Sequence, residues 1–151
     1  MSPSKDENKL IVANCSGFFG DRFCAAREMV EGGPIDVLTG DYLAELTMAI
    51  LLKDTFKDPN RGYARTFLRQ MEEIMGTCLD KNIRVVANAG GLNPNALAAG
   101  LSETAEKLGL HPKIACITSD DLMPRIEEHQ SASEAFVHLD KGESLKDTGP
   151  T

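Results

Sequence analysis

The chain has 151 residues, which fits one domain of ordinary size, and 42% of them are hydrophobic. Its 16 basic and 23 acidic residues leave a net charge of −7. That balance disfavours nucleic-acid binding and adhesion to an anionic membrane, because both require a basic surface. The polar start of the chain does not fit a secretory signal, and no apolar run approaches the ~18 residues of a membrane span. Since the four cysteines are scattered and form no C-x-x-C pair, we expect a reduced, cytoplasmic protein.

Short apolar runs alternate with amphipathic segments along the whole chain. Residues 10–14, 35–38, 83–87 and 113–118 are predicted strands. Residues 22–31, 42–53, 62–81, 94–108 and 119–129 are predicted helices. This alternation is typical of βαβ units, whose parallel strands are covered by helices. The predicted fold is therefore α/β, an open and mostly parallel sheet of about four strands with helices on both faces.

Two of the predicted helices carry strong sequence signals. In the helix over 62–81, seven apolar residues recur at the spacing of one buried face. They are Phe67, Leu68, Met71, Ile74, Met75, Cys78 and Leu79. For the next helix, Asn93 is the expected N-cap, Pro94 the first helical residue, and Gly109 the residue after its end. We expect one domain over residues 9–145, between a disordered segment at 1–8 and a flexible tail at 146–151.

Each predicted strand ends in a turn of small, polar or acidic residues, at 14–21, 39–41, 88–93 and 119–121. Parallel strands end at one edge of their sheet, here called the carboxyl edge, and ligands of open α/β sheets bind there. Glycines in these turns allow backbone N–H groups to approach a ligand closely, and the following helix N-termini favour an anion. These glycines are Gly17, Gly20, Gly40, Gly90 and Gly91.

The polar residues of the turns have two interpretations. Asp21, Asp41, Asn93 and Asp121 each stand where a helix is predicted to begin, so each could be only an N-cap. Carboxylates gathered at one edge could instead abstract a proton or bind Mg²⁺. We assign no metal, because α/β folds collect N-caps at this edge in any case. Arg22 could pair with an anionic ligand or with a carboxylate such as Asp21.

Cofactor and nucleophile motifs are weak in this sequence. Neither the G-x-G-x-x-G fingerprint nor a P-loop is present, which leaves NAD and ATP poorly supported and the cofactor unassigned. Cys15 lies in a carboxyl-edge turn, yet none of the three histidines is expected beside it as a base. A catalytic Cys15 is therefore disfavoured.

Four blocks in and around these turns resemble one protein family. They are Gly17-Phe-Phe-Gly-Asp-Arg22, Ile35-Asp-Val-Leu-Thr-Gly-Asp-Tyr-Leu-Ala-Glu-Leu-Thr47, Gly62-Tyr-Ala-Arg-Thr-Phe67 and Asn88-Ala-Gly-Gly-Leu-Asn-Pro94. Together they are similar to the acyclic terpene utilisation (AtuA) family, over about residues 10–145. The resemblance implies a component of the breakdown of citronellol and geraniol through CoA thioesters. Because members of the family are longer and continue after Leu145, it also implies that this chain matches their N-terminal part, either as a short form or as a truncated gene product.

The sequence thus predicts a component that binds or transforms an acyl-CoA or another anionic small molecule at the carboxyl edge. Asp41 is the first choice as catalytic base, with Asp21 as a second catalytic carboxylate. The predicted substrate-binding residues are Gly17, Gly20, Arg22, Gly40, Asn88, Gly90, Gly91 and Asn93. The alternatives are a non-catalytic interaction module or an inactive fragment, and a homo-oligomer or a missing C-terminal partner domain stays open.

Overall fold

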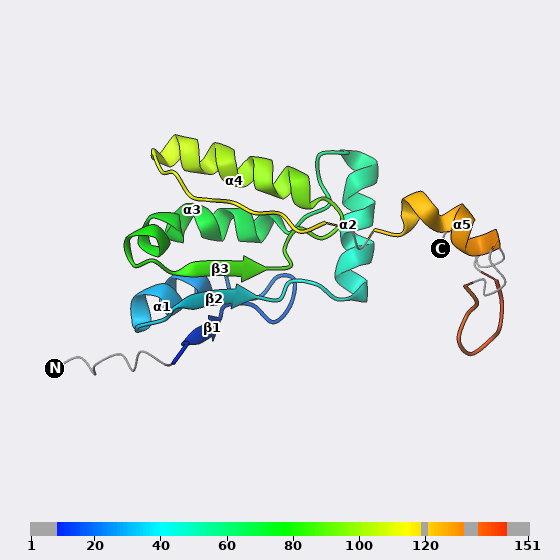
Figure 1. The fold of residues 1–151 in the computed structure, drawn as a ribbon, viewed down its shortest axis with the longest axis horizontal. Helices are drawn as coiled ribbons and strands as arrows, with labels where there is room; N and C mark the ends of the chain where they lie inside the picture. Colours follow the sequence, from blue (N-terminus) through cyan, green and yellow to red (C-terminus); the bar gives the residue numbers. More distant parts are fainter. Residues whose placement is uncertain (1–8, 119–120, 132–135, 145–151) are drawn as a thin grey trace. The chain divides into compact units, whose positions relative to one another are not determined.

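A computed structural model describes residues 9–118, 121–131 and 136–144 of the chain. These residues belong to two compact units, which divide between Ile117 and Thr118 and are described separately. The first unit contains a sheet of three parallel strands in the order β1-β2-β3, with its helices (Figure 1). Its strands are β1 (Val12–Asn14), β2 (Val37–Gly40) and β3 (Arg84–Ala87). Its helices are α1 (Ala25–Gly32), α2 (Glu45–Lys57), α3 (Arg65–Asp80) and α4 (Pro94–Leu108). The α/β class and the parallel sheet are confirmed.

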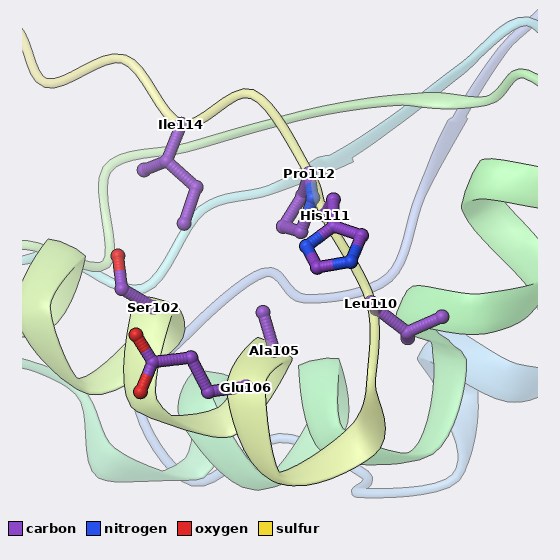
Figure 2. A pocket seen from close by; sticks show the side chains of 7 residues that line it. All are labelled: Ser102, Ala105, Glu106, Leu110, His111, Pro112 and Ile114. Atoms are coloured by element: carbon purple, nitrogen blue, oxygen red, sulfur yellow. The ribbon is translucent and has the colours of Figure 1, made fainter.

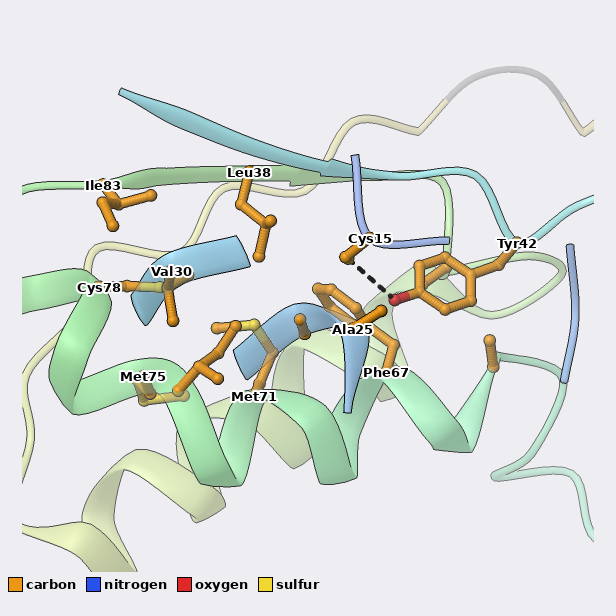
Figure 3. Packing of buried hydrophobic residues seen from close by; sticks show 14 of the residues in the cluster. Cys15, Ala25, Val30, Leu38, Tyr42, Phe67, Met71, Met75, Cys78 and Ile83 are labelled. Atoms are coloured by element: carbon orange, nitrogen blue, oxygen red, sulfur yellow. Dashed lines mark hydrogen bonds between the residues drawn. The ribbon is translucent and has the colours of Figure 1, made fainter. Parts of the chain in front are cut away.

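The helices α1 and α3 pack on one face of the sheet. Leu38 in the central strand pairs in register with Ala13 and Val85, and these three side chains point to that face. Figure 3 draws Leu38 above Val30 of α1 and the methionines of α3, all of them buried. The core therefore lies between the sheet and this helical layer.

Among the described residues of the first unit, no helix packs on the opposite face of the sheet, so the prediction of helices on both faces is not confirmed. Strand alternation places Val12 and Val86 on this face, where they are 53% and 61% exposed. The apolar runs at 10–14, 35–38 and 83–87 predicted strands correctly, but they carried no information about which of the two faces a helix covers.

The predicted fourth strand at residues 113–118 is wrong. The chain there is irregular and exposed, and Ile117 is 94% exposed. Apolar and β-branched residues favour an extended backbone, but a strand forms only where a neighbouring strand takes up its N–H and C=O groups. The described sheet therefore ends at β3.

The two helices with strong signals form as predicted, with one exception. Five of the seven apolar residues predicted for the buried face of α3 are buried and Leu68 is partly buried, whereas Leu79 is 42% exposed. The α4 prediction is confirmed, since Asn93 Oδ1 accepts from Ala96 N–H at 3.2 Å and Gly109 has a φ of +67°. Glycine adopts that left-handed conformation without the penalty of a Cβ.

The second unit contains η1 (Met123–Arg125), α5 (Ile126–Ser131) and an antiparallel bridge between Val137 and Ser144. The helix predicted over 119–129 is represented in the described residues by the 3-10 turn η1 and by α5, and residues 119–120 lie outside the described part. The predicted terminal segments 1–8 and 146–151 also lie outside it, so the prediction of one domain over 9–145 stays a prediction. Among the described residues, no helix is long and apolar enough to cross a membrane.

Candidate functional site

Three of the four predicted turns meet at the carboxyl edge. The N–H of Cys15 donates to the carbonyl of Thr39 at 2.8 Å, and the N–H of Asp41 donates to the carbonyl of Ser16 at 2.9 Å. The third turn joins them through Asn88, whose Oδ1 accepts from the N–H of Tyr42 at 2.8 Å. These bonds follow from the parallel register, which ends the three strands side by side. The fourth turn lies partly outside the described residues, and Asp121 belongs to the second unit.

Asp41 is an exposed carboxylate that the neighbouring turn holds in place. Asn88 Nδ2 donates to its Oδ1 at 2.7 Å, and the N–H of Leu43 donates to the same oxygen at 3.3 Å. The hydrogen bond from Asn88 is the main cause that lowers the pKa of Asp41, because it stabilises the charged form. Its capping interpretation is wrong, since α2 begins after Ala44 and has no side-chain cap.

Asp21 closes the first turn upon itself. Its two carboxylate oxygens accept from the N–H of Gly17 at 2.9 Å and from that of Arg22 at 2.6 Å. The bond from Gly17 is the main cause that lowers the pKa of Asp21. Asp21 is not a helix cap either, because α1 begins after Cys24. Its carboxylate orders the segment that carries Gly17 and Gly20.

Arg22 pairs with a carboxylate, but not with the one proposed. Its Nη2 lies 2.7 Å from Glu28 Oε2, and both side chains are largely exposed. An exposed ion pair of this kind contributes only about 0–1 kcal/mol. The guanidinium can therefore exchange Glu28 for a ligand at little cost.

The five edge glycines serve two different purposes. A Cβ on Gly91 would lie 2.4 Å from Leu51 Cδ1, and a Cβ on Gly40 would lie 2.5 Å from the ring of Tyr42. A Cβ on Gly90 would similarly press on Pro94, so the packing of the chain itself requires these three glycines. Gly17 and Gly20 are different, because no other group fills the space beside them closer than 3.9 Å. They are the glycines of the set that open toward solvent.

Helix N-termini place partial positive charge at the carboxyl edge. No described side chain caps α1, α2 or α3, although the backbone carbonyls of Arg22 and Ala64 accept from the N–H groups of Ala25 and Phe67. The start of α3 is tied to the third turn by the N–H of Ala64, which donates to the carbonyl of Ala89 at 2.8 Å. In its first turn, Thr66 Oγ1 is buried and has no hydrogen-bond partner among the described residues.

Beneath the edge lies a buried polar chain that the sequence analysis missed. The hydroxyl of Tyr42 donates to Gln70 Oε1 at 2.6 Å and lies 3.8 Å from Cys15 Sγ (Figure 3). Gln70 Nε2 donates onward to the carbonyl of Phe23 at 3.1 Å. A signal was present, since Gln70 stands three residues after Phe67 on the apolar face of its helix.

Burial favours the protonated forms of the Cys15 thiol and the Tyr42 hydroxyl. It raises the pKa of the Cys15 thiol, and it raises the pKa of Tyr42 far above its ordinary value. A buried, protonated thiol is a poor nucleophile. Cys15 and Tyr42 both belong to the buried core beneath the edge, and burial is a separate reason to disfavour a catalytic Cys15.

A shallow pocket of about 220 Å³ lies elsewhere, between the last turns of α4 and the segment that follows (Figure 2). It is lined by Ser102, Ala105, Glu106, Leu110, His111, Pro112 and Ile114. Because α4 begins at the carboxyl edge with Pro94, its last turns lie at the far end from the candidate residues. In the described part of the chain, no three His, Cys, Asp or Glu side chains cluster as metal ligands would.

The comparison with known families gives one match. The family described as acyclic terpene utilisation family protein AtuA matches residues 10–151. The match continues past Leu145, where the sequence analysis expected the resemblance to end. No curated protein and no solved structure matches the chain.

Proposed function

Because the chain belongs to the acyclic terpene utilisation family AtuA, we propose that this component binds an anionic small molecule, such as an acyl-CoA, at its carboxyl edge. The observation that carries the proposal is the joining of three turns by hydrogen bonds at the end of three parallel strands. That arrangement is the usual ligand site of open α/β sheets. Its donors are backbone N–H groups, which suit phosphate and carboxylate oxygens.

The first turn is the proposed anion site. Asp21 holds the turn closed through Gly17, and no described residue accepts a hydrogen bond from the N–H of Gly20. The uncapped start of α1 follows directly, and Arg22 can leave its exposed partner Glu28 to pair with the ligand. Together these groups supply the backbone N–H of Gly20, the N-terminal end of α1 and the Arg22 guanidinium for an anionic oxygen.

The second and third turns supply the proposed base. Asp41 is ionised near neutral pH and exposed, so it can accept a proton from a bound substrate. Asn88 acts as a positioning residue, because both ends of its amide are engaged by Asp41 and by the backbone of Tyr42. Its substrate-binding role in the sequence analysis is thereby replaced by a proposed role in orientation.

Ligand-dependent melting tests the proposal directly. Free CoA, acetyl-CoA and a terpenoid acyl-CoA are added separately to the full chain, and we expect each bound compound to raise the melting temperature. Arg22→Ala should reduce the shift, whereas Arg27→Ala, which removes an exposed arginine within α1, should not. The absence of any shift at millimolar concentrations of all three compounds would reject the acyl-CoA proposal.

A second candidate function is that of a non-catalytic interaction module. The specific observation in its favour is the open face of the sheet, where Val12 and Val86 are exposed although parallel sheets are normally covered on both faces. A chain that no CoA compound stabilises, but that binds a protein partner and loses it with Val86→Glu, would fit this function instead.

A further inference from the structure

The outward face of α2 is unusually apolar for a surface helix. Leu46 is 73% exposed and Phe56 is 81% exposed, and Ile50 and Leu52 lie between them, also exposed. The helix buries Thr47 and Leu51 on its other side, so it carries apolar residues almost all round. A helix of this kind is normally covered on both sides. Its outward face is therefore a candidate contact surface.

The spacing on this face is that of a helix-to-helix contact. Leu46, Ala49, Lys53 and Phe56 follow one another at intervals of three, four and three residues. This is the a/d spacing by which one helix packs along another. When two copies of α2 run antiparallel and cross near Leu51, Leu46 of each copy lies level with Phe56 of the other. Ala49 then lies level with Lys53, whose four-carbon stem can pack while its ammonium group reaches water.

The charges on α2 also favour an antiparallel copy of the same helix. Glu45 stands at its first residue and Lys57 at its last. Both charges suit the helix macrodipole of one chain alone, but that effect does not explain the exposed apolar residues between them. In an antiparallel pair, Glu45 of each copy lies level with Lys57 of the other, and the two macrodipoles oppose. A parallel pair would place like charges side by side.

We propose that α2 is a self-complementary docking surface, and that its occupant is α2 of a second copy of this chain in a two-fold antiparallel pair. A two-fold interface uses the same patch on both copies, so one patch must complement itself, as this one does in the spacing of its residues and in charge. The proposal is independent of the acyl-CoA function. In this pair, Lys57 of the second copy lies level with Glu45, the first residue of α2. Glu45 follows Asp41 of the candidate site by four residues.

Sedimentation equilibrium over a range of protein concentrations tests the pairing. We expect a reversible dimer whose Kd rises by about tenfold or more in Leu46→Glu and in Phe56→Glu, because each change puts a charge in the apolar centre. The matched control is Val86→Glu, which places the same charge on the other exposed apolar surface and should leave the Kd unchanged. Circular dichroism establishes that all variants keep their fold, as expected for exposed positions.

A charge exchange tests the antiparallel direction. Glu45→Lys alone should weaken the dimer, because it opposes Lys57 of the second copy. Adding Lys57→Glu to that variant should restore the Kd to about the original value, because the exchanged charges again face their opposites. A chain that stays monomeric at all concentrations overturns the proposal. A dimer that dissociates with Val86→Glu but not with Leu46→Glu, or that the double exchange does not restore, overturns it as well.

Discussion

Hydrogen bonds from the chain itself lower the pKa values of Asp41 and Asp21. For each carboxylate, the first cause of the lowered pKa is a neighbouring N–H donor, from the Asn88 side chain for Asp41 and from the Gly17 backbone for Asp21. A folded pKa below the unfolded value means that these bonds stabilise the fold above the unfolded pKa. That contribution disappears as the pH falls through the folded pKa.

We therefore predict that Asn88→Ala raises the pKa of Asp41 toward its ordinary value. The variant should lose stability near neutral pH, but it should lose less than the original chain on further acidification, because less of its stability depends on ionised Asp41. The measurement is a carboxyl-carbon NMR titration, together with urea unfolding at pH 7 and pH 3. Asn95→Ala, which alters an exposed asparagine of α4, is the control. An unchanged Asp41 titration in Asn88→Ala would contradict the assignment.

Tyr42 should be the more costly of the two tyrosines to alter. Tyr42→Phe removes the hydroxyl that donates to Gln70 Oε1, and it leaves that buried oxygen without a donor. An unpaired buried polar group costs about 1–3 kcal/mol, so we expect the free energy of unfolding to fall by that amount. Urea denaturation measures it, with Tyr63→Phe as the control because Tyr63 is only partly buried. Equal losses in the two variants would mean that the Tyr42 hydroxyl does not stabilise the fold.

Between elements, Gly91 decides how closely the third turn approaches α2. Its φ is +51°, and a Cβ there would meet Leu51 of α2 and the carbonyl oxygen of Gly62 at 2.8 Å. We predict that Gly91→Ala destabilises the chain by about 1–3 kcal/mol, from strain and overpacking together. Gly32→Ala should be neutral or slightly stabilising, because Gly32 is the last residue of α1 and has open space around it. Thermal unfolding of both variants checks the contrast, and a neutral Gly91→Ala would refute it.

The elements themselves were predictable where the signal is local. The α4 helix begins and ends as Asn93, Pro94 and Gly109 predict, because caps act within one turn of the chain. The strands and their parallel order also followed from local alternation. The strand at 113–118 did not, because pairing depends on a distant partner that an apolar run does not specify.

The candidate site was predictable in outline and not in detail. Parallel strands brought three turns together, as expected from topology. The helix α1 begins at Ala25, three residues after the predicted start at residue 22. Arg22 and Asp21 therefore lie in the turn before the helix, and this position determines their partners. That shift turned an expected cap into a turn-closing carboxylate. The contact between Tyr42 and Gln70 spans 28 residues, beyond the reach of any local pattern.

At the scale of the molecule, the strands of the sheet differ in how many neighbouring strands hold their backbone amides. The central strand β2 is paired on both sides, with β1 and with β3, and its Leu38 is 1% exposed. The strand β3 is paired with β2 alone among the described residues. Residues 113–117 are exposed and form no described strand. Local stability should therefore fall from the middle of the sheet outward, since backbone amides open most easily where few contacts hold them.

Hydrogen exchange followed by mass spectrometry measures this gradient in the intact chain. We predict that amides of 37–40 exchange last, close to the rate set by global unfolding, and that amides of 113–117 exchange within the first seconds to minutes. Val86→Glu should leave this order unchanged, because it alters a side chain on the open face and no backbone pairing. Slow exchange over 113–117 in the free chain would mean that this segment pairs with β3 in solution, and the sheet would then have a fourth strand after all.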